Sequence, residues 1–142
     1  MIEQIAAMLA SILAKKDAGQ IGEARQEMDG QSRRTIGLTI EEIKKLSPEA
    51  VANLLTAGGA LQPVRAVTLA ELLLVDADLA TEKGEAPVAN LVHAFCLLAD
   101  SIEALNSEDQ IVYRARLKLL AEKLGDFRTH PYIGERMSRL GV

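Results

Sequence analysis

Asp76 and His93 are the two residues of this 142-residue chain whose types and spacing could place an acid beside a base. They lie in two long apolar segments, 63–83 and 87–105, which a short Gly-Glu-Ala linker separates. If these segments are antiparallel helices that turn at the linker, Asp76 and His93 lie at the same height along the pair. Such a contact could be a buried polar pair that fixes helix register, or part of a proton-transfer site. The structural role is favoured, because catalysis would need a third convergent group.

The other reactive side chains near this pair do not complete a catalytic or metal-binding set. Asp76 and Asp78 are two residues apart, so on a helix they point roughly 200° away from each other. Asp100 is seven residues from His93, which strains a compact three-ligand site. Cys96 is one turn from His93, but a thiol in an apolar helix, away from positive charge, is inert. The sequence therefore predicts no catalytic residue, no bound metal and no cofactor.

The alternative is a small enzyme, or a metal- or anion-binding protein, that uses acidic residues and His93 of the central segments. Burial of ionisable groups in apolar helices would perturb their pKa values, as occurs at functional sites. However, the sequence has no HExxH motif, no paired ExxH motif and no phosphate-binding glycine loop.

Arg114 and Lys118 form a second candidate binding site, on a helix predicted after Ser107. They are one turn apart and could grip a phosphate group or an acidic partner, in which case binding would depend on salt. Charged side chains of this kind more often lie on the solvent-exposed face of a surface helix and bind nothing. Arg114, Lys118, Asp76 and His93 are the candidate binding residues.

The composition narrows the class of protein. Hydrophobic residues make up 49% of the chain but aromatic residues only 3%, which suits packed helices and not a surface that stacks sugars or bases. The net charge is −4, and residues 61–106 hold most of the acidic excess, with two Lys or Arg against seven Asp or Glu. Nucleic-acid affinity rests on neutralising phosphates, so no nucleic-acid partner is expected.

The beginning of the chain does not have the pattern of a signal peptide. Glu3 and Gln4 stand where a positive leader belongs, and Lys15 and Lys16 follow the apolar run instead of preceding it. No uninterrupted apolar stretch reaches membrane-spanning length. With a single cysteine no intramolecular disulfide can form. We expect a cytoplasmic protein that has no membrane contact.

The spacing of apolar residues predicts an all-α fold, built as stacked antiparallel helical hairpins in a superhelix or a helical bundle. The predicted helices cover residues 2–16, 21–34, 40–46, 48–56, 63–83, 87–105, 107–124 and 133–140. In the helix over 107–124, the residues expected to face inward are Ile111, Leu117, Leu120, Ala121 and Leu124. Nothing alternates with a period of two, so no strand is predicted. Residues 1–142 are expected to form a single all-helical domain, with 127–142 as a loosely packed tail.

Local signals set several of these boundaries. Thr39 with Glu42 has the spacing of a capping box, in which each side chain satisfies a free backbone amide of the other. Ser107 with Gln110 has the same spacing. Ser47 followed by Pro48 is typical of a cap and a first helical position.

The first helical pair resembles the second half of a tetratricopeptide repeat (TPR), through the pattern Gly19-x-Ile21-x-x-Ala24-x-x-x-Met28. The central pair repeats part of this pattern with Gly84, Ala89 and His93, and has the small residue Ala77 where the repeat expects one. The first pair departs from it at Ile12, Lys15 and Gln31. Residues 2–28 and 69–85 are also similar to an uncharacterised bacterial family of small TPR-like helical proteins. This resemblance implies stacked antiparallel helices that bind proteins or self-associate, and it transfers no catalytic residue.

The first helix is apolar over more than one narrow stripe, because Met8 lies off the line of Ile5, Leu9 and Ile12. Either two layers of the same domain cover these side chains, or they are exposed and pair with a second copy or a partner helix. A twofold dimer is the commonest outcome of such pairing. We expect a non-catalytic protein–protein interaction or scaffold module, a homodimer with a possible protein or peptide partner, and take these four residues as its candidate interface.

Overall fold

Helices dominate the structure, a computed structural model that describes residues 2–142. The helices are α1 (Ile2–Asp17), α2 (Ile21–Ile36), α3 (Ile40–Lys44), α4 (Pro48–Leu54), α5 (Pro63–Glu82), α6 (Val88–Ser101), α7 (Ser107–Lys123) and α8 (Pro131–Leu140). Two short 3-10 helices, η1 (Ile102–Ala104) and η2 (Gly125–Phe127), follow α6 and α7. The prediction of an all-α fold is confirmed.

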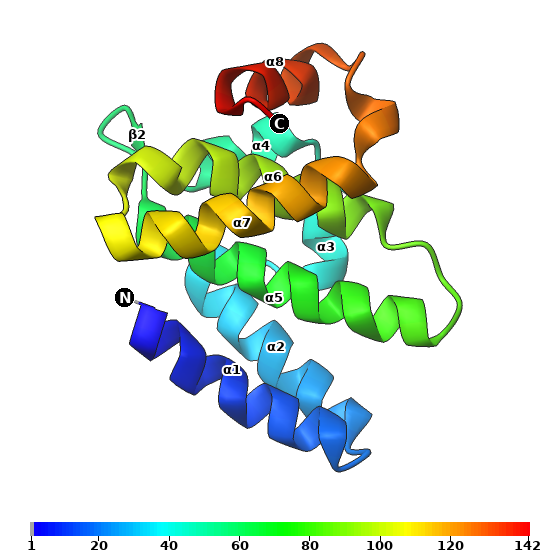
Figure 1. Cartoon of the computed structure of the whole chain (residues 1–142). Coiled ribbons are helices and arrows are strands. Elements are labelled where there is room, and N and C mark those ends of the chain that lie inside the picture. The colour runs from blue at the N-terminus through cyan, green and yellow to red at the C-terminus, as the bar shows by residue number, and fades with distance from the viewer. Residues whose placement is uncertain (1) are drawn as a thin grey trace.

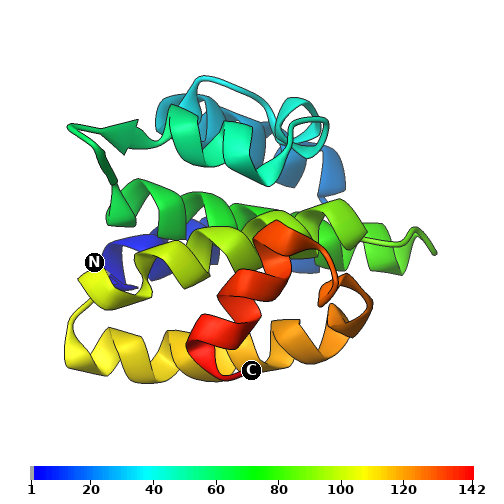
Figure 2. The same ribbon diagram turned by 90° about the horizontal axis from the view of Figure 1, so that it is seen from above.

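Helices α5 and α6 pack against each other at the centre of the fold (Figure 1). Figure 2 shows α2, α3 and α4 on one side of this pair and α7 and α8 on the other. Every residue from 69 to 73 in α5 is buried, so the helix is covered around its whole circumference. A helix with no polar face needs neighbours on several sides, and the shorter helices supply them. The buried side chains join into one hydrophobic core.

Most predicted start signals are confirmed. The Thr39 hydroxyl accepts a hydrogen bond from the Glu42 amide at 3.3 Å, and the Glu42 carboxylate accepts one from the Thr39 amide at 3.2 Å. The cap of α7 was predicted one residue too late, because Asn106 and not Ser107 accepts the hydrogen bond from the Asp109 amide, at 2.9 Å. Asn is as favourable a cap as Ser, so the residue type alone did not separate the two positions.

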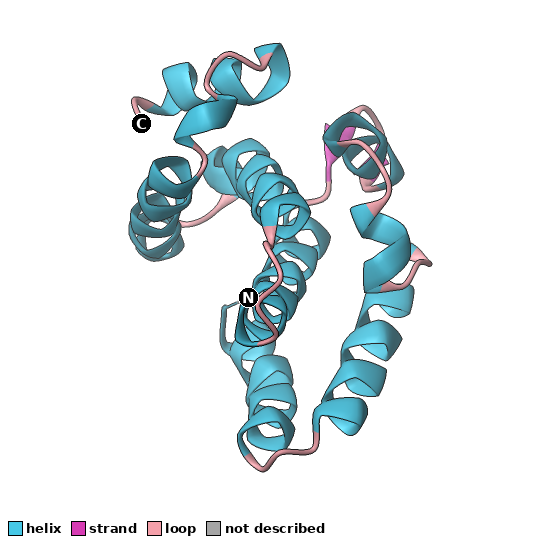
Figure 3. Ribbon diagram, turned by 90° about the vertical axis from the view of Figure 1, so that its right-hand side faces the viewer, coloured by secondary structure: helices cyan, strands magenta, loops and turns pink. Residues whose placement is uncertain are grey.

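A two-stranded antiparallel hairpin, β1 (Thr56–Ala57) and β2 (Ala60–Leu61), replaces the predicted end of the fourth helix (Figure 3). Its turn residues Gly58 and Gly59 have φ values of 62° and 81°. This left-handed conformation suits a tight hairpin turn and favours glycine at both positions. The helix therefore ends at Leu54, before the glycines.

The expectation of a loosely packed tail is wrong for α8. Ile133 and Met137 are 2% and 0% exposed and belong to the core. Asp100 of α6 accepts hydrogen bonds from Arg136 at 2.8 Å and from Arg139 at 3.0 Å. The apolar face of α8 and the hydrogen bonds from its two arginines to Asp100 therefore hold α8 against α6.

Candidate functional site

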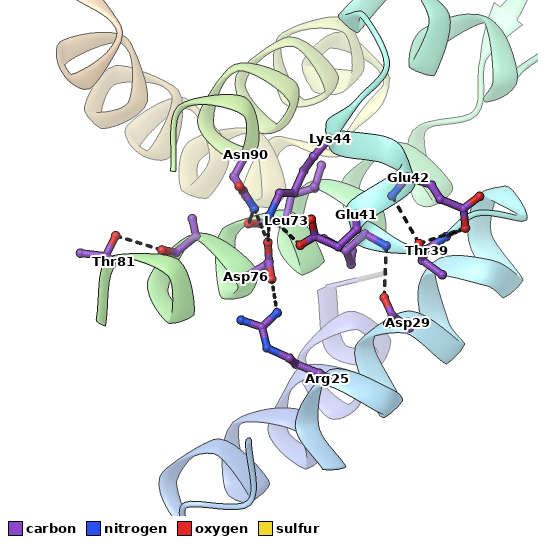
Figure 4. Close-up of polar contacts among 12 residues, drawn as sticks. Arg25, Asp29, Thr39, Glu41, Glu42, Lys44, Leu73, Asp76, Thr81 and Asn90 are labelled. Carbon is purple, nitrogen blue, oxygen red and sulfur yellow. Dashed lines mark hydrogen bonds and ion pairs between the residues drawn. The ribbon is translucent and has the colours of Figure 1, made fainter. Parts of the chain in front are cut away.

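A buried polar cluster surrounds Asp76, which is 1% exposed (Figure 4). Its Oδ1 accepts a hydrogen bond from Arg25 of α2 at 3.0 Å, and its Oδ2 accepts one from Lys44 of α3 at 3.1 Å. Asn90 of α6 donates to the same Oδ2 at 2.9 Å and also to the backbone carbonyl of Leu73 at 2.9 Å. One carboxylate on α5 thus links three other helices.

The electrostatics of the cluster keep Asp76 ionised. Burial alone would raise the pKa of this carboxyl group, but hydrogen bonds from Asn90 and Lys44 and the charges of Lys44 and Arg25 together hold it below its ordinary value. Two opposing effects also act on the pKa of Lys44. Burial lowers this pKa, but the carboxylates of Glu41 and Asp76 raise it above its ordinary value. Both groups remain charged at neutral pH, so the arrangement is a stable ion pair and not a proton-transfer pair.

The expected contact between Asp76 and His93 is not formed, and Asn90, about one turn earlier on α6, occupies that place. Matching residues by their distance from the centre of the linker therefore missed the facing residue by about one turn. His93 is buried at 3% exposure, and its Nδ1 has no hydrogen-bond partner among residues 2–142. Burial lowers the pKa of His93 below its ordinary value, although a hydrogen bond to the backbone of Leu46 opposes this effect. His93 is therefore a neutral core residue.

His93 makes the stability of the fold depend on pH. Because its pKa is lower in the folded state than the ordinary value of 6.5, the unfolded chain binds more protons between these two values. The contribution of His93 to the stability of the folded state is complete when the pH is above the ordinary histidine pKa, and it is lost as the pH falls through the folded-state pKa. We expect urea denaturation between about pH 8 and about pH 5 to show falling stability. His93→Met should flatten this dependence.

The other candidate reactive residues are separated from one another. Asp78 is exposed and lies away from the cluster of Asp76, as its helical spacing predicted. Burial raises the pKa of the Cys96 thiol to about 12, with Arg136 opposing the shift, so this group remains protonated at neutral pH. Asp100 is engaged by the arginines of α8. Among the residues that the structure describes, no three His, Cys, Asp or Glu side chains lie where they could hold one metal ion.

Arg114 and Lys118 both lie on the exposed side of α7. Arg114 forms an ion pair with Glu103 at 3.3 Å, and both side chains are largely in solvent. Lys118 borders an open pocket of about 420 Å³ together with Glu122 and Arg128. The two candidate residues therefore face different neighbours, and an acidic side chain accompanies each of them.

The four apolar residues of the predicted α1 interface do not share one environment. Ile5 and Ile12 are 6% and 0% exposed and pack into the core of the same chain, while Met8 and Leu9 are half-buried at its edge. Two of the four side chains are thus covered by intrachain packing, as in the first of the two alternatives. Leu13, which was not among them, is more exposed, at 36%.

An apolar groove of about 370 Å³ lies between α1 and α7, with α5 as its floor. In Figure 1, α7 lies above α5, and α1 lies below it, with α2 visible between α1 and α5 in this view. The apolar lining of the groove consists of Leu9, Leu13, Leu74, Val75, Ala77, Leu91 and Leu120. Glu71 of α5 and Arg116 of α7 form an ion pair at its base, with the Glu71 side chain 7% exposed. Asp78 and Lys123 also border the groove, so the apolar surface has a polar rim.

Sequence reasoning missed the three partners of the Asp76 carboxylate, namely Arg25, Lys44 and Asn90. Asn90 gives a signal in retrospect, since a lone amide within an apolar helix usually has a buried hydrogen-bond partner. Arg25 and Lys44 lie on helices with many other charges, and nothing in their spacing distinguishes them.

Comparisons of the chain with protein-family models, with curated proteins and with solved structures gave no match. Across the described residues, the structure contains no helix that is both long enough and apolar enough to cross a membrane.

Proposed function

We propose that this chain is a non-catalytic helical interaction module that self-associates. The position of its exposed apolar side chains carries the proposal. Seven large hydrophobic side chains are exposed in the described part of the chain. Leu13 lines the groove, and Ile111, Val112 and Leu119 lie on the outward side of α7, the helix that forms one wall of the groove. Apolar side chains concentrated around a groove with a polar rim are typical of protein-interaction surfaces.

The polar residues of the core support a structural role for the ionisable groups. Asp76, Glu71 and Asp100 each lie on a central helix and form ion pairs with residues of a neighbouring helix. Carboxylates engaged in this way position helices and offer no free base to a substrate. The resemblance to tetratricopeptide repeats, whose stacked hairpins bind proteins, supports the same function.

The test is the mass of the protein in solution. Light scattering across a range of concentrations should give a mass that approaches twice the 15.3 kDa of one chain as the concentration rises. A mass that stays at 15.3 kDa up to the highest concentration would contradict self-association.

A further inference from the structure

Helix α7 carries apolar side chains on two opposite sides, and only one of these sides is covered. The inward side consists of Tyr113, Leu117, Leu120 and Ala121, which are all buried. The outward side carries Ile111, Val112 and Leu119, which are 72%, 49% and 59% exposed. The prediction that Ile111 faces the core is therefore wrong. At 100° per residue, Ile111 lies about 120° around the helix from Leu117 and about 140° from Leu124, so it belongs to the second apolar face.

Four residues of α7 form a straight line along this outward face: Glu108, Val112, Leu119 and Lys123. At 100° per residue they lie within a sector of roughly 60°. Val112 and Leu119 each lie about 5 Å along the axis from the midpoint between Ala115 and Arg116, and Glu108 and Lys123 each lie about 11 Å from it. Read from either end, the line therefore gives a charged residue, two apolar residues and a residue of the opposite charge.

We propose that α7 pairs with α7 of a second copy of this chain, in antiparallel orientation, about a twofold axis at this midpoint. This proposal rests on the proposed self-association and names its surface. Antiparallel pairing places Val112 against the partner subunit's Leu119, and Glu108 against the partner subunit's Lys123. The twofold axis repeats both contacts, so a single helix supplies two apolar contacts and two ion pairs. The small side chain of Ala115, near the axis, allows the two helices to approach closely.

The charges around this line favour a second copy over other partners. Within residues 2–142, neither Glu108 nor Lys123 has an ion-pair partner, whereas Arg114 and Arg116 are paired with Glu103 and Glu71. The two unpaired charges are thus available at the heights where a second α7 presents their opposites. The line has no net charge, so it does not match a strongly acidic or basic partner.

Charge reversal tests this arrangement in the full-length chain. Glu108→Lys alone and Lys123→Glu alone should each raise the dimer dissociation constant by about tenfold or more, because each places like charges opposite each other at two positions. The double variant E108K/K123E restores both pairs with exchanged signs and should recover the dimer. Glu85→Lys in the α5–α6 linker changes the net charge by the same amount as Glu108→Lys and should have no effect. Dissociation constants come from sedimentation or light scattering at several concentrations.

A separate substitution tests the apolar contact between the two α7 helices. Leu119 is exposed in the single chain, so Leu119→Ser should leave the helical circular dichroism unchanged while it weakens the dimer. A dimer that is insensitive to the charge reversals and to Leu119→Ser would overturn the α7 pairing and leave self-association intact. A wild-type protein that is monomeric at all concentrations would overturn both proposals.

Discussion

Asp76→Asn is expected to lower the free energy of unfolding by about 3 kcal/mol. The substitution keeps the shape of the side chain but removes the negative charge that faces Arg25 and Lys44. These two cations would then lie beside a buried amide, and Asn90 would lose a charged acceptor. Breaking a buried pair by removing one partner is costly because the other charge stays partly desolvated. Chemical denaturation, with the midpoint and slope fitted together, gives the change.

Asp78→Asn is the matched control for this prediction. It makes the same chemical change two residues further along α5, at an exposed position. An exposed substitution of this kind changes stability by no more than about 0.5 kcal/mol. Equal effects of the two substitutions would show that the cluster around Asp76 contributes nothing beyond a surface charge.

The helices were predictable from the sequence because their signals are local. Apolar spacing, the Thr39 cap and the Ser47-Pro48 start each depend on residues within one or two turns, and the structure confirms them. The β1–β2 hairpin was missed because two-residue strands are too short to show an alternating pattern. The glycines that shape its turn were instead taken only as the end of a helix.

The candidate site was only partly predictable, because it depends on how separate helices meet. The sequence singled out Asp76 as a polar residue in an apolar helix, and the structure confirms its burial. Its partner on α6 depends on the register of the hairpin, and a difference of one turn replaces His93 by Asn90. The contacts from Arg25 and Lys44 depend on the placement of α2 and α3 against α5, which no local pattern encodes.

Helix α7 shows a second limit on what the sequence alone can predict. Periodicity identifies an apolar face but does not say whether another helix of the same chain covers it. In α1, the face that contained Ile5 and Ile12 is covered by the chain itself. In α7, the face that contains Val112 and Leu119 is not. Only the three-dimensional arrangement separates the two cases, and it moves the proposed interface from α1 to α7.

Gly134→Ala is expected to destabilise the protein by about 2 kcal/mol, within the range for overpacking at a buried position. Gly134 lies inside α8, where alanine would ordinarily improve helix stability. However, a Cβ atom at this position would lie 2.1 Å from the backbone carbonyl oxygen of Arg128, which is too close for any contact. Since backbone and not a flexible side chain blocks the space, α8 must move away from the turn that follows η2. That movement would also loosen the packing of Ile133 and Met137 in the core.

Gly30→Ala provides the contrast that isolates this steric effect. Gly30 is also inside a helix, α2, but a Cβ atom there would meet no atom within 4 Å. Alanine loses less conformational entropy than glycine on folding, so this substitution should stabilise the protein by roughly 0.5–1 kcal/mol. Urea denaturation of both variants should therefore give changes of opposite sign, and hydrogen exchange should show faster exchange of the α8 amides in Gly134→Ala alone. Stabilisation by both substitutions would mean that α8 does not pack against Arg128 as closely as the structure places it.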